Sequence, residues 1–197
     1  DGDWKDKWKE FFKPTKVTDR IVVKPTWEEY TPKENELVIE IDPGMAFGTG
    51  THETTSLCMK LMEKYLGEHP EEKKILDVGC GSGILSICGA LLGSREILGI
   101  EIDEDAVRVA HENVEENHVE DAVKVMQGDL TKGVDFKADV IVANLMADLD
   151  ASFGGCQKAP DGGRHIHFFR YSGRKRGNGI GGDPRGRLSY RRDCRGR

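Results

Sequence analysis

The sequence lacks the features that mark membrane-spanning and secreted proteins. It contains no run of about 18 apolar residues, and no charged-then-apolar leader opens the chain. Its five cysteines show no C-x-x-C spacing, which argues against a disulfide framework or a zinc site and favours reduced, buried thiols. We therefore expect a cytoplasmic protein without bound metal, whose 197 residues suffice for one domain with a sizeable core.

Three nucleotide-binding or catalytic signatures are also incomplete. The glycine-rich segment 75–83 places its third glycine one residue too early for the dinucleotide fingerprint G-x-G-x-x-G, and it lacks the Gly-Lys-Ser/Thr ending of a P-loop. His52-Glu53 does not continue to H-E-x-x-H, because residue 56 is serine. These departures disfavour a nicotinamide oxidoreductase, a P-loop protein and a zinc protease.

What residues 75–83 do contain is a short apolar run followed by alternating glycines, Ile-Leu-Asp-Val-Gly-Cys-Gly-Ser-Gly. This pattern predicts a strand that leads into a ligand-binding loop. Gly79, Gly81 and Gly83 allow the backbone to turn tightly and approach a ligand, and the following helix offers its free N–H groups to polar or anionic atoms. We expect Asp77 to orient the loop through backbone N–H groups or to approach a ligand cation.

The net charge of −6 conceals a sharp division of the chain. Residues 151–197 hold 12 Lys and Arg against 3 Asp and no Glu, a balance of +9, whereas residues 1–150 carry −15. One interpretation is an Arg/Gly-rich tail that binds nucleic acid. The other is an out-of-frame tail, since reading one nucleotide later permits an acidic string with helical and strand periodicity. We expect the second, with residues 163–169 still able to form a strand.

Upstream of the tail, strands alternate with helices. The patterns predict strands at 37–41, 75–78, 97–102, 123–127 and 138–143, and helices at 51–66, 83–92 and 105–117. This order predicts an α/β, Rossmann-like fold with a doubly wound, mostly parallel sheet, whose ligands bind at the carboxyl ends of the strands. With an out-of-frame tail, the sheet would be incomplete after its fourth strand and residues 140–143 would form an exposed apolar edge.

Polar residues follow the strands at that ligand-binding edge. Glu101 could accept hydrogen bonds from ribose hydroxyls, and Asp129 could accept one from an exocyclic adenine amine. The alternatives are a solvated strand-end acid and a turn residue. Asn144 places an amide carbonyl where a substrate N–H could donate to it. Asp103 and Asp105 are expected to cap the next helix.

Asp77 to Gly83, Glu101, Asp129 and Asn144 together resemble the successive motifs of class I S-adenosylmethionine-dependent methyltransferases. Residues 41–55, Ile-Asp-Pro-Gly-Met-Ala-Phe-Gly-Thr-Gly-Thr-His-Glu-Thr-Thr, narrow the resemblance to the ribosomal protein L11 methyltransferase (PrmA) family over about residues 4–149. Trp27 and the sequence Asn-Leu-Met-Ala at 144–147 fit the same family. The resemblance implies S-adenosyl-L-methionine as cofactor, with the methionine side of its pocket lined by Phe47, Gly48, Thr49 and Gly50. Thr51 or Thr54 is a candidate cap of the following helix.

The resemblance also implies a substrate and a division of the chain. The substrate would be a large-subunit ribosomal protein, methylated on lysine and α-amino groups, with Asn144 as the residue that orients the amine. Residues 1–30 would be a linker and the start of the catalytic domain, 31–149 the cofactor-binding domain and 150–197 the aberrant tail, without the family's amino-terminal substrate-recognition domain. A nucleic-acid methyltransferase is the nearest alternative, but the residues after Asn144 lack the two prolines and the aromatic residue typical of those enzymes.

Overall fold

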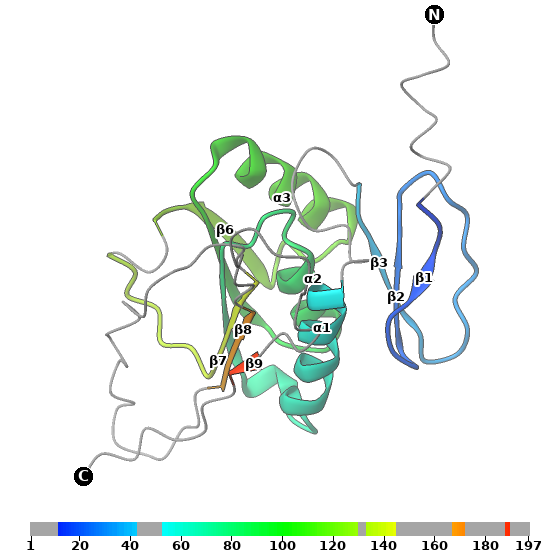
Figure 1. Cartoon of the computed structure of the whole chain (residues 1–197), viewed down its shortest axis with the longest axis horizontal. Helices are drawn as coiled ribbons and strands as arrows, with labels where there is room; N and C mark the ends of the chain where they lie inside the picture. Colours follow the sequence, from blue (N-terminus) through cyan, green and yellow to red (C-terminus); the bar gives the residue numbers. More distant parts are fainter. Residues whose placement is uncertain (1–11, 43–52, 130–132, 145–166, 172–187, 190–197) are drawn as a thin grey trace, which may run out of the picture.

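The structure, a computed structural model, describes residues 12–42, 53–129, 133–144, 167–171 and 188–189. It contains a six-stranded sheet with three α-helices beside it and a separate three-stranded sheet (Figure 1). In the described ranges, no helix has both the length and the apolar character needed to cross a membrane.

The elements that the sequence predicts before residue 150 agree with their predicted ranges to within two residues at either end. The strands are β1 (Thr15–Lys16), β2 (Ile21–Lys24), β3 (Leu37–Glu40), β4 (Lys74–Val78), β5 (Glu96–Glu101), β6 (Val123–Gln127), β7 (Val140–Ala143), β8 (His167–Tyr171) and β9 (Leu188–Ser189), and the helices are α1 (Glu53–Leu66), α2 (Ile84–Leu91) and α3 (Glu104–Glu116). The sequence patterns did not predict β1, β2 or β9, and β8 overlaps the range 163–169 that we expected to be able to form a strand. The strands β1 and β2 are short: β1 has two residues, and β2 has three adjacent apolar residues, all buried, in place of an alternating pattern.

The larger sheet has the order β6-β5-β4-β7-β8-β9. Every neighbouring pair is parallel except β8 and β9, which are antiparallel. The chain runs from β4 outward to β6 and then crosses to β7 on the other side of β4, so the strand order reverses between β4 and β7. The predicted α/β fold with a mostly parallel sheet is confirmed, and the glycine-rich loop leaves β4 at this point of reversal.

The expectation that the sheet ends at its fourth strand is wrong. Residues 140–143 do not form an edge, because Val140 to Ala143 pair in parallel with His167 to Arg170 of β8. Backbone N–H and C=O groups make the ladder, and an open strand edge accepts any extended segment with little regard to its side chains. Whether residues 150–197 are out of frame stays a prediction.

All three described α-helices contribute to a single hydrophobic cluster on one face of the sheet. This cluster contains Met59 and Met62 of α1, Ile87 of α2 and Val114 of α3 beside alternate residues of the strands. The opposite face presents Leu76, Val78, Ile100 and Ala143, which pack against the segment before β7, with Val134, Phe136 and Ala138. The helices α1, α2 and α3 therefore stand on the same side of the sheet as Asp77, which alternates with Leu76 and Val78.

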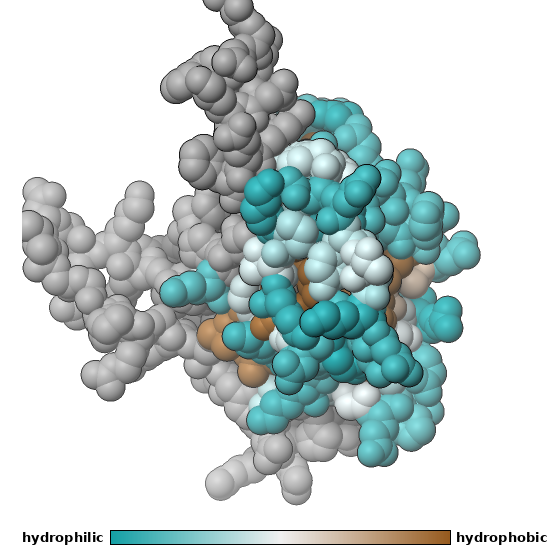
Figure 2. Space-filling model, turned by 90° about the vertical axis from the view of Figure 1, so that its right-hand side faces the viewer, coloured by the Kyte–Doolittle hydropathy of each residue, from teal (hydrophilic) through white to brown (hydrophobic). Residues whose placement is uncertain are grey.

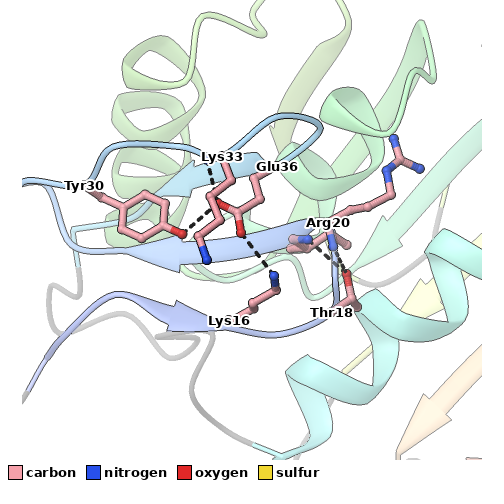
Figure 3. A network of polar contacts seen from close by, with 7 residues as sticks. Lys16, Thr18, Arg20, Tyr30, Lys33 and Glu36 are labelled. Atoms are coloured by element: carbon pink, nitrogen blue, oxygen red, sulfur yellow. Dashed lines mark hydrogen bonds and ion pairs between the residues drawn. The ribbon is translucent and has the colours of Figure 1, made fainter.

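The small sheet extends the helix-side core and presents a polar surface outward. β2 pairs in parallel with β3, and Ile21, Val23 and Ile39 join the main cluster. On the outside, Glu36 accepts hydrogen bonds from the Lys33 backbone N–H and the Tyr30 hydroxyl, and it pairs with Lys16 (Figure 3). Figure 2 shows this side of the molecule as largely hydrophilic.

Candidate functional site

The glycine-rich loop between β4 and α2 has the tight backbone that its composition predicts. Gly81 and Gly83 adopt positive φ angles of 54° and 79°. A Cβ on Gly83 would lie 3.3 Å from the Ala110 Cβ of α3, so both the backbone conformation and the space favour glycine there. The Gly79 and Cys80 N–H groups both donate to the Ile100 carbonyl, at 2.7 and 3.0 Å, which ties the loop to the end of β5.

Asp77 lies beneath this loop and is 1% exposed. Its partner is Ser86 of α2, whose hydroxyl donates to Oδ2 at 2.7 Å, rather than the loop N–H groups that the sequence suggested. Burial raises the pKa of Asp77 to about 7, partly opposed by the hydrogen bonds from Ser86 and reinforced by the charge of Glu101. Gly99, opposite Asp77 on β5, leaves room for the pair, since a Cβ there would lie 3.2 Å from the Ser86 Oγ.

Glu101, at the end of β5, is held close to the loop by both of its carboxylate oxygens. Oε2 accepts from the Gly81 N–H at 2.9 Å, and Oε1 accepts from the N–H groups of Ile102 and Asp103 at 2.8 and 3.2 Å. The contact with Gly81 follows from the adjacency of β4 and β5, whose carboxyl ends share one edge of the sheet. The predicted contact with ribose hydroxyls stays a prediction.

Two further acidic residues and an apolar side chain lie at the same edge. Asp129 is exposed and follows β6, next to Gly128, whose N–H donates to the Glu101 carbonyl at 2.8 Å. Ile102, directly after Glu101, is a large apolar residue that is 64% exposed. Asp103 caps α3 by accepting the Asp105 N–H at 3.0 Å, so the capping prediction is right for Asp103, while Asp105 lies in the first turn.

Asn144 follows β7 on the other side of the strand reversal. Its amide Nδ2 donates to the Thr55 Oγ1 of α1 at 3.0 Å, and Thr55 is only 1% exposed. This bond uses the amide nitrogen and not the carbonyl oxygen. The sequence analysis missed Thr55, although a polar residue that begins the buried stripe of α1 is a signal that could have identified it.

Thr54 lies inside α1, so it is not the residue that precedes the helix. Thr51 and the predicted pocket residues Phe47, Gly48, Thr49 and Gly50 lie outside the described residues, as do residues 145–147 after Asn144. Among the described residues, His69, Glu71 and Glu72 form one cluster whose ligand atoms lie within 4.8 Å of one another. This exposed cluster precedes β4, so it lies away from the carboxyl edge that holds Glu101 and Asn144.

Comparison with known proteins agrees with this arrangement. Residues 1–153 match the family described as ribosomal protein L11 methyltransferase (PrmA). A protein named ribosomal protein L11 methyltransferase from Clostridium botulinum (strain Eklund 17B / Type B) is 54% identical over 147 residues, which cover 75% of this chain and 46% of the relative. A protein of the same name from Heliobacterium modesticaldum is 52% identical over 149 residues, which cover 76% of this chain and 46% of that protein.

A crystal structure described as ribosomal protein L11 methylase, from Lactobacillus delbrueckii subsp. bulgaricus, has a similar fold. It is 30% identical, the match covers 81% of each chain, and the TM-score is 0.70. The chain spans about half the length of the curated relatives that it matches. Since the family match extends over residues 1–153 and includes the glycine-rich loop, Glu101, Asp129 and Asn144, the chain belongs to the ribosomal protein L11 methyltransferase (PrmA) family.

Proposed function

We propose that this chain is the cofactor-binding part of an S-adenosylmethionine-dependent N-methyltransferase that acts on amines of ribosomal protein L11. The observation that carries the proposal is the gathering of the glycine-rich loop, Glu101 and Asn144 around the reversal of strand order between β4 and β7. Open α/β sheets bind their ligands at such a point.

The residues at this edge fit the parts of S-adenosylmethionine. The loop glycines allow close approach of the backbone, and α2 begins at its end with backbone N–H groups suited to polar or anionic atoms. Glu101 accepts three backbone N–H groups, which leaves one of its roughly four lone pairs, on Oε2, for a ribose hydroxyl. The exposed side chain of Ile102 offers an apolar surface beside it for the adenine ring.

The cofactor supplies an activated methyl group on a sulfonium, so no protein nucleophile is needed. The protein must align the amine lone pair with the methyl–sulfur bond and exclude water. Exposing the lone pair of a lysine costs about 4 to 5 kcal/mol at neutral pH, whereas an α-amino group costs only about 1 kcal/mol. Asn144 Oδ1 is suited to accept an N–H from the neutral amine, while Thr55 fixes the orientation of the amide.

The names of the relatives support the substrate assignment, and the family match favours a protein substrate over the nucleic-acid alternatives.

We also propose the division into residues 1–30, 31–149 and an aberrant tail at 150–197. The end of the family match at residue 153 supports the last boundary. Sequencing the encoding DNA tests it, since codons incompatible with an acidic, periodic string in the shifted frame would exclude the out-of-frame interpretation.

Isothermal titration with S-adenosylmethionine tests the proposed cofactor site. Glu101→Gln removes the charge at the loop, and Glu96→Gln makes the same change at the opposite end of β5, where Glu96 pairs with Lys74. We expect binding by the unmodified chain, a loss of at least about tenfold in affinity for Glu101→Gln and no loss for Glu96→Gln. Equal affinities of the two variants, or no binding by the folded chain, would contradict the proposal.

A further inference from the structure

Helix α3 supports the glycine-rich loop from behind through two residues that lie one turn apart. Ala110 is fully buried, and its Cβ lies 3.3 Å from where a Gly83 Cβ would stand. Asn113 is 3% exposed, and its Nδ2 donates to the Ser82 carbonyl at 2.9 Å. The apolar contact fixes the distance between α3 and the loop. The Asn113 hydrogen bond holds the carbonyl half of the peptide group between Ser82 and Gly83, whose N–H half donates to the Cys80 carbonyl at 2.8 Å.

The other half of the Asn113 amide reaches a different part of the chain. Its Oδ1 accepts from the backbone N–H of Asp42 at 3.3 Å, just after β3. A single buried side chain therefore joins the glycine-rich loop, α3 and the chain that leaves the small sheet. Both polar atoms of the amide are used, which is the condition under which a buried asparagine holds its partners rather than destabilises the core.

Asn117, the residue that follows α3, lies one turn beyond Asn113 and makes a similar pair of contacts that does not involve the loop. Its Nδ2 donates to the Glu40 carbonyl at 2.6 Å, and its Oδ1 accepts from the Glu40 N–H at 2.8 Å. The same Nδ2 also donates to the Asn113 carbonyl at 2.7 Å. The two asparagines thus lie one turn apart at the end of α3 and both bind the chain at or just after β3, but only Asn113 contacts the glycine-rich loop.

We infer that Asn113 is a positioning residue for cofactor binding, because it holds the Ser82 carbonyl toward α3. A carbonyl that loses this donor is held less firmly, and a rotation toward the ligand side of the loop would place its oxygen where it repels an anionic or lone-pair-bearing group. With the carbonyl anchored, the N–H groups at the start of α2 can meet the ligand, since those of Gly79, Cys80, Gly81 and Gly83 already donate within the protein. The inference rests on the proposed function, in which this loop receives S-adenosylmethionine.

Two aspartate variants distinguish a positioning role of Asn113 from a general loss of stability. Asn113→Asp keeps an oxygen for the Asp42 N–H, but it replaces the donor nitrogen with an oxygen that faces the Ser82 carbonyl. Asn117→Asp makes the same chemical change one turn away, where the partner is the Glu40 carbonyl. Each variant is compared with the unmodified chain by isothermal titration with S-adenosylmethionine, and by the amide resonances of Gly79, Gly81 and Gly83 in ¹H–¹⁵N spectra recorded without cofactor.

We expect Asn113→Asp to bind about tenfold more weakly and to shift the glycine resonances, and Asn117→Asp to change affinity by less than about threefold and leave those resonances in place. Equal losses of affinity, or glycine resonances that respond alike to both changes, would overturn the inference. If the unmodified chain does not bind the cofactor, the proposed function fails, while the resonances still decide whether Asn113 positions the loop. Should Asn113→Asp not fold, Asn113→Ala and Asn117→Ala serve as the pair.

Discussion

The hydroxyl of Thr55 accepts a 3.0 Å hydrogen bond from the amide of Asn144, although the two residues lie 89 positions apart in the sequence. The contact joins the first turn of α1 to the end of β7. We propose that the Asn144 side chain orients the substrate amine. Its hydrogen bond to the buried Thr55 holds that side chain in place. Asn144 is half-buried, whereas Thr55 is buried within the helix-side core region.

Replacing Thr55 with valine should remove this support at nearly constant volume. The Asn144 amide then loses a partner in a partly buried position, and we expect the free energy of unfolding to fall by about 1 to 2 kcal/mol. The resonances of the Asn144 side-chain NH₂ should shift at the same time. Thr55→Ser retains the hydroxyl and should restore both quantities toward those of the unmodified chain. Urea unfolding and NMR spectra of the three proteins measure this, and a Thr55→Ser variant as perturbed as Thr55→Val would argue against the hydrogen bond.

Asp77 should make stability fall as the pH rises from about 4 to about 7. Burial raises its pKa from 3.8 to about 7, so in this interval the folded state retains a proton that the unfolded state has released. The favourable contribution of the neutral acid is fully present below pH 3.8 and is lost as the pH rises through the folded pKa. The loss is on the order of 4 kcal/mol.

Asp77→Asn removes the titration while keeping an oxygen for the Ser86 hydroxyl. The difference in unfolding free energy between the unmodified chain and this variant, measured in urea from pH 4 to pH 8, isolates Asp77 from all other groups. We expect the variant to gain stability relative to the unmodified chain across this interval. A difference that does not change with pH would show that Asp77 is ionised throughout.

Glu36 should give stability the opposite dependence on pH from Asp77. Hydrogen bonds from the Lys33 backbone N–H and the Tyr30 hydroxyl, together with the Lys16 ammonium, lower its pKa to about 2. Its contribution is present above the ordinary value of 4.5 and is lost as the pH falls toward 2. Glu36→Gln should therefore be less stable than the unmodified chain at pH 7 and equally stable near pH 2. Acid titrations of unfolding for both proteins check this, with Glu29→Gln as a control in the same polar loop.

Gly83→Ala and Gly67→Ala should distinguish backbone strain from contact with α3. Both glycines have positive φ, 79° and 64°, but a Cβ on Gly67 meets nothing within 4 Å, whereas one on Gly83 meets Ala110. We expect Gly67→Ala to cost about 1 kcal/mol through its backbone alone, and Gly83→Ala to cost about 1 to 2 kcal/mol more. Thermal unfolding compares them, and equal costs would mean that α3 yields to the added methyl group.

The features that could be predicted from the sequence are those that neighbouring residues determine. The strand at residues 75–78, the loop glycines and the cap at Asp103 each follow from neighbouring residues, and the structure has them where they were expected. The partners of site residues were missed where they come from distant elements. Ser86 beneath Asp77 and Thr55 beside Asn144 depend on how helices pack on the sheet, which no local pattern encodes.

The wrong expectation about the edge of the sheet had a different cause. The expectation of an exposed edge at residues 140–143 was argued from the lack of side-chain periodicity in the tail, while the pairing of β7 with β8 is made by the backbone. The short strand β2 was missed because the neighbour that confirms it, β3, follows after a polar segment of a dozen residues. In both cases pairing between segments, rather than the pattern within one segment, decides the structure.

The pairing of β7 with β8 affects how the sheet would respond to a change of the sequence after residue 150. Main-chain hydrogen bonds between two strands depend little on the side chains of either strand. A change of the sequence after residue 150 therefore need not leave an open strand edge through which copies of the protein would aggregate. The central strands, the glycine-rich loop and α3 all precede that position. A change of sequence after residue 150 would therefore spare the ligand-binding half of the sheet, provided that the new segment can extend beside β7.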